Sequence, residues 1–230
     1  MKKWDELPDY MQTPEVREYY DILCQKTVSL KLKRAFDVVV ASIMLVILAI
    51  PMAIISIKIA TESKGGVFYR QERVTTYGKK FKIHKFRTMV ANADQIGSAV
   101  TVSGDSRITP TGEFLRKYRL DEFPQLIDVL QGNMSFVGTR PEVPKYVDQY
   151  TDEMYATLLL PAGITSEASI RYKDEADLLD AAEDVDKTYI EEVLPGKMKY
   201  NLETVKKFNF FREILTMFRT VFAVLGKEYE

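Results

Sequence analysis

Histidine and cysteine are almost missing from this chain of 230 residues. Cys24 is the only cysteine, which excludes an intrachain disulfide and a zinc site built on several cysteines. The lack of disulfides fits a reducing, intracellular environment. His84 is the only histidine, so paired histidines cannot carry acid–base chemistry, and carboxylates or lysines are the remaining candidates.

Several nucleotide-binding and targeting signals are absent as well. The chain has no G-x-G-x-x-G motif, no Walker A loop and no repeat at a fixed period. Its first 25 residues are polar, so we expect no signal peptide. The net charge of -1 names no partner, but eight basic residues and one acidic residue lie between positions 64 and 89. We therefore expect one surface to meet anions.

One hydrophobic run stands out near the N-terminus. Residues 38–57, "VVVASIMLVILAIPMAIISI", form a stretch of twenty residues without a charge, long enough as a helix to cross roughly 30 Å. Pro51 interrupts this stretch, and an interior proline kinks or breaks a helix. Lysines and arginines flank both ends, and such flanks prefer the cytoplasm. A re-entrant hairpin that bends at Pro51 satisfies both flanks, while a spanning helix and a buried core helix stay open. Asp37 and Lys58, at the two ends, are expected to reach lipid headgroups.

The C-terminal region predicts a second amphipathic element. Between residues 205 and 227 apolar side chains recur at helical spacing, and lysines and arginines fill the remaining faces. A basic amphipathic helix with several phenylalanines suits a bilayer surface. A terminal helix that packs on the protein core gives the same pattern, and the sequence does not decide between them.

The middle of the chain predicts an α+β fold that is mostly helical. Short segments rich in β-formers, Phe68–Tyr69 and residues 80–86, flank the turn signal "TTYGKK" and predict a small β-hairpin. Residues 104–110 are expected to form a loop. Predicted helices cover residues 111–118, capped by Thr111, and residues 121–130, 144–160 and 176–192.

Two adjacent carboxylates in "RLDEFPQL" are the clearest chemical signal. If Asp121 is the N-cap of its helix, Pro124 falls in the first turn, where its missing N–H costs nothing. Asp121 and Glu122 then lie at the positive end of the helix dipole, which favours the ionised form. Neighbours on a helix point about 100° apart, so one carboxylate can attack or be positioned while the other holds a metal ion. A cap with a solvated neighbour is the alternative.

Arginines close to this pair in the sequence favour phosphoryl chemistry. Arg116 lies one turn earlier, Arg140 follows in "SFVGTRPE", and Arg107 lies beside Asp105 in "GDSRIT". Guanidinium groups match phosphate oxygens bidentately. Near a membrane anchor and without histidine, they suggest a lipid-borne or diphosphate substrate. Each arginine taken alone is equally explained as a surface ion-pair partner.

Six motifs in order carry a family resemblance: "KRAFDVVVA", "VFYRQERV", "KFRTM", "VTVSGDSRIT", "FLRKYRLDEFPQLIDVLQGNMSFVGTRP" and "PAGIT". From about Leu32 to Pro161 the chain resembles the monotopic phosphoglycosyl transferases, bacterial sugar transferases that start glycan assembly on undecaprenyl phosphate. The resemblance implies an N-terminal extension (residues 1–30), a re-entrant membrane helix (31–62) and a catalytic part (63–230) ending in an amphipathic interfacial helix. It places the protein on the cytoplasmic face of the inner membrane. The segment "PEVREYYDILCQK" has helical spacing and predicts an additional helix in the extension.

The resemblance also implies a two-step reaction. Asp121 is then the nucleophile, which attacks the β-phosphorus of a nucleotide diphosphate sugar, usually a UDP-sugar, and releases UMP. The phosphosugar passes from Asp121 to undecaprenyl phosphate, and Glu122, beside Asp121, helps to hold Mg²⁺. Phosphate or substrate contacts fall to Arg116 and Arg140, with Lys85, Arg87, Asp105 and Arg107 at further motif positions. Membrane lipids are expected partners, nucleic acid is not, and a homodimer is compatible with the resemblance.

The chain departs from the family pattern in three places. Ile50-Pro51 replaces the usual Ser-Pro, "GTRP" replaces G-P-R-P, and the sequence after "PAGIT" lacks the usual glycine-rich continuation. That last region is expected to help choose the sugar, so no sugar is inferred. Two alternatives stay open: a non-catalytic membrane adaptor whose basic patch binds anionic lipid, and a nucleotide-sugar glycosyltransferase that uses "DVD", Asp184 to Asp186, as its metal motif.

Overall fold

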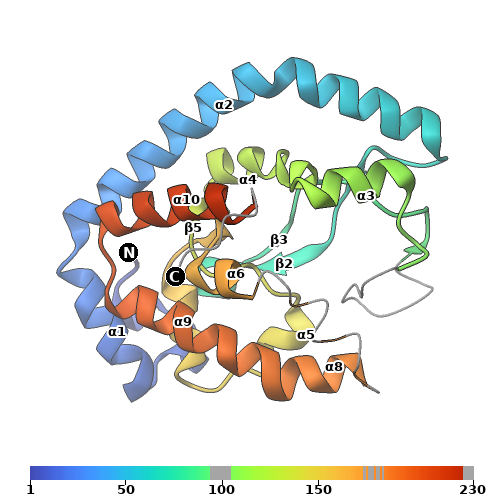
Figure 1. Ribbon diagram of the computed structural model, residues 1–230. Coiled ribbons are helices and arrows are strands. Elements are labelled where there is room, and N and C mark those ends of the chain that lie inside the picture. Colours follow the sequence, from blue (N-terminus) through green and yellow to red (C-terminus); the bar gives the residue numbers. More distant parts are fainter. Residues whose placement is uncertain (94–104, 173–174, 176–178, 180–181, 183, 225–230) are drawn as a thin grey trace.

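The computed structural model describes residues 1–93, 105–172, 175, 179, 182 and 184–224 (Figure 1). Helices dominate this part of the chain, as predicted, and its strands form short two-stranded ladders. The α-helices are α1 (Pro14–Cys24), α2 (Thr27–Glu62), α3 (Pro110–Lys117), α4 (Gln125–Gln131), α5 (Pro144–Val147), α6 (Glu167–Arg171), α8 (Val185–Thr188), α9 (Leu194–Lys206) and α10 (Phe210–Val224). The strands are β1 (Phe68–Tyr69), β2 (Glu72–Val74), β3 (Lys80–Lys82), β4 (Lys85–Phe86), β5 (Met134–Val137) and β6 (Ala162–Thr165).

Helix α2 contains the whole hydrophobic run and continues through Pro51. Its 36 residues correspond to about 54 Å. Figure 1 shows that α2 rises along one side of the molecule, changes direction near its middle and descends over α3. A bend is the expected effect of a proline that removes one helical hydrogen bond. Only 6% of the most apolar window of α2 is buried, which excludes the core-helix alternative. The helix is long and apolar enough to cross a membrane.

The start of the apolar run is anchored in protein. Asp37 was expected to reach headgroups, and this prediction is wrong: its side chain is buried and accepts a hydrogen bond from the Phe136 N–H at 3.3 Å. One turn earlier, the Lys33 ammonium donates to the Val137 carbonyl at 2.7 Å and to Glu213 at 2.8 Å. The side chains of Lys33, Asp37 and Glu213 are buried, and their partners fasten α2 to β5 and α10.

The predicted β-hairpin is confirmed, with a break that divides it into two ladders. Antiparallel β2 and β3 pair Arg73 with Phe81, and antiparallel β1 and β4 pair Tyr69 with Lys85. A second sheet was not predicted. Strands β5 and β6 are parallel, with Ser135 opposite Gly163, and join the "VGTRP" and "PAGIT" motifs.

The N-terminal extension forms part of the protein core. The additional helix predicted there is α1, where the Thr13 side chain accepts a hydrogen bond from the Val16 N–H. The buried side chains of Val16 and Leu23 belong to the same apolar cluster as Leu159 and Met198. Residues 1–24 are therefore packed against the part of the chain that follows α2.

Three predicted helices, in addition to the one at residues 121–130, differ from the structure. The helix at residues 144–160 is reduced to α5 and a 3₁₀ segment, Met154–Leu159, because the polar stretch "DQYTD" between them favours turns. The cap of α3 is Thr109, not Thr111, and it accepts a hydrogen bond from the Gly112 N–H. Most of residues 176–183 lie outside the described residues. Beyond them α8 continues through a π-helical turn (Tyr189–Val193) into α9. Pro195 lies in the first turn of α9, a position that tolerates proline.

The C-terminal helix α10 packs on the protein core along one edge and exposes an apolar stripe along another, so each of the two alternatives for this helix, core packing and a bilayer surface, is met in part. Along one edge its Met217 packs on an apolar cluster that includes residues of α2 and α4. Along the other edge Phe211, Leu215, Phe218 and Val221 are exposed at helical spacing. An exposed apolar stripe of this size is typical of a surface that contacts lipid or another protein.

Candidate active site

Asp121 and Glu122 lie in a 3₁₀ turn, Leu120–Glu122, between α3 and α4. The prediction that Asp121 caps a helix is wrong, because α4 begins at Gln125 and Pro124 precedes it. Arg119 adopts a left-handed conformation (φ 56°), which reverses the chain after α3 and tightens the next residues into the turn. Such a backbone costs an ordinary residue about 1–3 kcal/mol and is concentrated at functional sites. A helix dipole therefore does not explain the two carboxylates.

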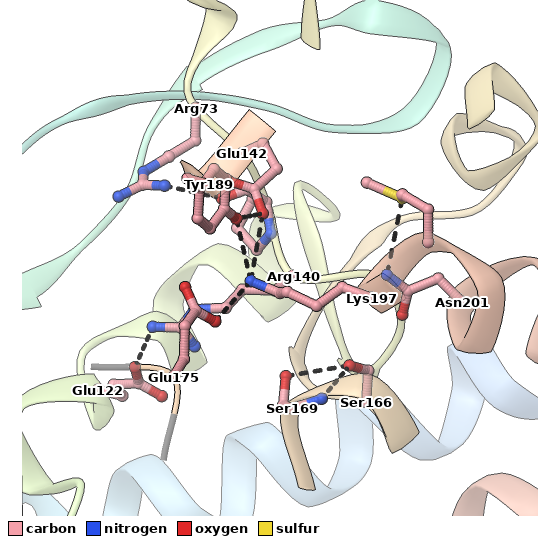
Figure 2. Close-up of polar contacts among 12 residues, drawn as sticks. Arg73, Glu122, Arg140, Glu142, Ser166, Ser169, Glu175, Tyr189, Lys197 and Asn201 are labelled. Atoms are coloured by element: carbon pink, nitrogen blue, oxygen red, sulfur yellow. Dashed lines mark hydrogen bonds and ion pairs between the residues drawn. The ribbon is translucent and has the colours of Figure 1, made fainter. Parts of the chain in front are cut away.

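Side-chain cations hold this carboxylate pair instead. The Lys85 ammonium, on β4, lies 2.8 Å from Asp121 Oδ2 and 3.5 Å from Glu122 Oε1. The Arg140 guanidinium donates to Glu122 Oε1 at 2.7 Å (Figure 2). Asp121 and Glu122 are both buried. Burial alone raises the pKa of Glu122, but the charges of Arg140 and Lys85 outweigh it and hold this pKa well below its usual range. Reciprocally, Glu122 raises the pKa of Arg140.

Two glycines bring Arg140 to this position. A Cβ on Gly138 would lie 2.4 Å from the Pro161 carbonyl oxygen, and one on Gly163 would lie 2.2 Å from the Gly138 nitrogen. Any side chain at either position would separate the "VGTRP" and "PAGIT" segments. The Gly163 N–H donates to the Thr139 carbonyl at 2.9 Å, which fixes the residue before Arg140. The two motifs thus build one support for the guanidinium.

One oxygen of Asp121 is left over. Oδ1 is buried and has no hydrogen-bond partner among the described residues. Arg116 is close enough to Asp121 to sense its charge: burial lowers the pKa of the Arg116 guanidinium, and the charge of Asp121 opposes that change. Leaving a buried carboxylate oxygen unpaired costs free energy in the free protein. An oxygen of this kind is available to a substrate or a cation.

Two cavities share the cations that contact the carboxylate pair. The first, about 200 Å³, is called the cationic cavity; Gln125 and six cations line it: Arg73, Lys85, Arg87, Arg107, Arg116 and Arg140. The second, about 720 Å³, is called the wide cavity, and its lining residues include Met44 of α2, Glu122, Tyr189 and Lys197. Arg73, Lys85, Arg116 and Arg140 line both. An anion held between the cavities would contact several of these cations at once.

The other predicted site residues have more structural surroundings. Arg107 lines the cationic cavity and forms a bidentate pair with Asp105, at 2.6 and 2.9 Å, which lowers the pKa of Asp105. Asp105 therefore orients Arg107. Arg87 lines the same cavity, but its guanidinium donates to the carbonyls of Ser63 and Lys64 just beyond α2. The site thus combines Asp121, Glu122, Lys85 and Arg140 directly, with Arg116 and Arg107 on the cavity wall.

The acidic "DVD" motif is used for structure. The Asp184 carboxylate caps α8 by accepting from the Lys187 N–H at 3.0 Å. Asp186 pairs with Lys145 and accepts a hydrogen bond from the Tyr146 hydroxyl, both at 2.6 Å. With these partners the two aspartates do not form the metal motif of the glycosyltransferase alternative.

Several residues near the site were not singled out from the sequence. Arg73 lies in the basic run, and Gln125 lies in the longest motif, where its buried Oε1 has no partner among the described residues. Proximity to the carboxylate pair in sequence could have identified Gln125. Lys197, Tyr189 and Glu142 come from separate segments, and no sequence pattern marks them as a group.

The carboxylate pair is compatible with Mg²⁺. Magnesium in phosphoryl-transfer sites usually takes one or two carboxylates and completes its octahedron with substrate phosphates and water. Within the described residues no group of three or more His, Cys, Asp or Glu side chains could hold a metal ion by itself. The unpartnered Asp121 Oδ1 and the neighbouring Glu122 fit a metal that arrives with a phosphate ligand.

Comparison with known proteins agrees with the motifs. The family described as "Bacterial sugar transferase" matches residues 28–227. The chain belongs to this family. It is 33% identical over 198 residues to the UDP-N-acetylgalactosamine-undecaprenyl-phosphate N-acetylgalactosaminephosphotransferase of Aeromonas hydrophila, covering 84% of this chain and 44% of the relative.

Two further relatives of this bacterial sugar transferase carry the name UDP-glucose:undecaprenyl-phosphate glucose-1-phosphate transferase. The protein from Escherichia coli (strain K12) is 34% identical over 196 residues, 83% of this chain and 39% of its own length. That from Caulobacter vibrioides is 31% identical over 196 residues, 84% of this chain and 69% of its own length. The chain thus spans less than half the length of the first two relatives.

Proposed function

We propose that this sugar transferase moves a sugar-1-phosphate from a nucleotide diphosphate sugar, a UDP-sugar, to undecaprenyl phosphate through a covalent intermediate on Asp121. The observation that carries the proposal is a buried aspartate whose one oxygen is unpartnered, beside two cavities that share four cations. Three relatives whose names state this reaction class support it.

In the first step an Asp121 carboxylate oxygen attacks the β-phosphorus of the donor. The bond from that phosphorus to the bridging oxygen breaks, and UMP leaves with the oxygen and its electron pair. In the second step an oxygen of undecaprenyl phosphate attacks the same phosphorus, and Asp121 leaves as a carboxylate. An ionised carboxylate needs no base to activate it, which fits a chain whose one histidine, His84, is bonded to Asp128.

The surrounding cations have separate roles in this proposal. Lys85 contacts Asp121 and can stabilise the negative charge as it moves from the carboxylate to the phosphoryl group. Arg116 and Arg107, on the wall of the cationic cavity, contact the α-phosphate that becomes UMP. Arg140 holds Glu122 in place and is available to the β-phosphate. Asp105 orients Arg107, and Arg87 fixes the end of α2 beside the cavity.

We further propose that Mg²⁺ binds at Asp121 and Glu122 together with the donor diphosphate. When bound, it neutralises phosphate charge and makes UMP a better leaving group. Glu122 suits this role because its low pKa keeps it ionised at neutral pH. Titration with EDTA should abolish turnover, and Mg²⁺ should restore it.

We also propose that α2 enters and leaves the bilayer on the same, cytoplasmic, face. The bend of α2 near its middle and the cations beyond both ends favour this topology over a straight span. The exposed apolar stripe of α10 then lies in the interface. With Cys24 replaced by serine, single cysteines at Lys31 and Lys64 should both react with an impermeant reagent added from the cytoplasmic side. Reaction of one position from each side would contradict the hairpin.

One assay tests the reaction and its alternative. Purified protein with Mg²⁺, undecaprenyl phosphate and UDP-sugars should release UMP and form a lipid diphosphate sugar. Release of UDP would indicate an ordinary glycosyltransferase. If the protein binds membranes but releases no nucleotide from any UDP-sugar of a panel, it is a lipid-binding adaptor.

A further inference from the structure

A second buried polar cluster lines the wide cavity. The Tyr189 hydroxyl donates to Glu142 Oε1 at 2.7 Å, and the Lys197 ammonium donates to the Tyr189 oxygen at 3.0 Å and to Glu175 Oε2 at 2.9 Å (Figure 2). Lys197 also lies 3.7 Å from Glu142. Lys197, Tyr189 and Glu142 are buried, and all four residues line the wide cavity. None of them has a role in the phosphoryl transfer proposed above.

The charge of this cluster differs from that of the cationic cavity. Its two glutamates and one lysine sum to a formal charge of -1. The cationic cavity has six cations and no carboxylate among its described lining residues. A phosphate suits the cationic cavity and is repelled by the cluster, because like charges in a partly buried site cost free energy. The cluster therefore suits a neutral polar ligand.

The groups left free in the cluster are hydrogen-bond acceptors. The Lys197 ammonium already has three oxygen neighbours, and the Tyr189 hydroxyl both donates and accepts. Among the described residues, the second oxygens of Glu142 and Glu175 have no hydrogen-bond donor, and sugar hydroxyls are suitable donors to them. Tyr146 and Tyr172 line the same cavity, and aromatic side chains suit the apolar side of a pyranose. Lys197 and Tyr189 hold the two carboxylates at fixed positions.

We infer that the part of the wide cavity lined by this cluster is the subsite that selects the sugar of the donor. Glu142 and Glu175 accept hydrogen bonds from hydroxyls of a neutral sugar, and Lys197 and Tyr189 are positioning residues. The order of the donor matches the order of the site: nucleotide in the cationic cavity, β-phosphorus at Asp121, sugar in the wide cavity. UMP can then leave while the phosphosugar stays in its own cavity. This inference rests on the proposed function.

Competing donors and direct binding test the subsite. Glu175→Gln keeps the side-chain shape but weakens the acceptor, and Lys197→Met removes the group that fixes it. We expect kcat/KM for the preferred donor among UDP-glucose, UDP-galactose and their 2-acetamido analogues to fall about tenfold or more. The ratio between the best and the worst donor should narrow, and the inhibition constant of UMP should stay within about twofold. Wild-type enzyme should disfavour UDP-glucuronic acid over UDP-glucose, and Glu175→Gln should reduce that preference.

A matched control separates recognition from stability. Tyr19→Phe removes a hydroxyl that is hydrogen-bonded to a glutamate, Glu153, at 2.6 Å, but neither residue lines the wide cavity, so the variant should leave the donor ratio unchanged. Equal losses for every donor in Glu175→Gln and Lys197→Met, or a parallel weakening of UMP, would overturn the subsite. Calorimetry of donor binding to Asp121→Asn separates the two proposals. If this binding depends on the sugar of the donor but the wild-type enzyme releases no UMP, only the proposed reaction is contradicted.

Discussion

Two buried ionic clusters in this protein use the same side-chain types for different ends. In the anchor cluster, Lys33, Asp37 and Glu213 bind one another or backbone groups of β5, and burial raises the pKa of Glu213 to about 6 despite the nearby lysine. At the carboxylate pair, cations outweigh burial and lower the pKa of Glu122, yet Asp121 Oδ1 has no partner among the described residues. A cluster whose charged groups each have a protein partner fastens helices together, whereas one with surplus cations on the cavity wall suits an anionic ligand.

The largest expected effect comes from Asp121→Asn. Removing the nucleophile should lower the rate of UMP release by at least about 10³-fold, since asparagine cannot form the acyl phosphate. Asp37→Asn is the matched control, because it neutralises a buried aspartate of the anchor cluster. It should lower the midpoint of thermal unfolding and leave turnover per folded molecule within a few-fold. Equal losses of activity in the two variants would remove the distinction between the clusters.

The next effect concerns stability. Lys33→Met leaves Glu213 buried without its cation and should cost about 3 kcal/mol of unfolding free energy. Denaturation of the detergent-solubilised protein, followed by circular dichroism, measures this cost. The double variant Lys33→Met/Glu213→Leu should recover much of it, because no unpaired carboxylate then remains on α10. If the single variant is as stable as the wild type, the anchor cluster does not fasten α2 to α10.

The raised pKa of Glu213 predicts a dependence of stability on pH. Its folded pKa of about 6 exceeds the ordinary value of 4.5, so between these values the folded state binds more protons than the unfolded state. The contribution of Glu213 to unfolding free energy therefore falls by about 2 kcal/mol as pH rises through this window. Glu213→Gln should flatten this part of the stability curve. An unchanged curve in the variant would show that another group titrates there.

The smallest effect is on metal affinity. Glu122→Gln should raise the Mg²⁺ concentration needed for half-maximal UMP release about tenfold, because one anionic ligand is lost. Glu213→Gln is the control, since it changes a buried glutamate of the anchor cluster. A Mg²⁺ requirement that is the same in wild type and Glu122→Gln would place the metal elsewhere.

The sequence predicted the helices and the hairpin better than the turns and long-range contacts that connect them. Periodicity identified the apolar helix and the hairpin, and the long motif identified Asp121 and Glu122 together with Arg140. The turn that presents the pair depends on a left-handed Arg119, which no local pattern indicates. The β5–β6 pair depends on two glycines whose backbones touch across 25 residues of chain. The Glu142–Tyr189–Lys197 cluster joins segments distant in the sequence, and periodicity carries no information on such contacts.

Mass spectrometry of the enzyme incubated with donor and Mg²⁺, but without undecaprenyl phosphate, tests the covalent step most directly. The aspartyl intermediate predicts a protein whose mass rises by one sugar phosphate, with the adduct on the peptide that contains Asp121 and one UMP released per modified chain. Adding undecaprenyl phosphate should restore the original mass. An unmodified Asp121 under conditions where UMP appears only together with lipid product would contradict the intermediate and favour direct transfer between the two substrates.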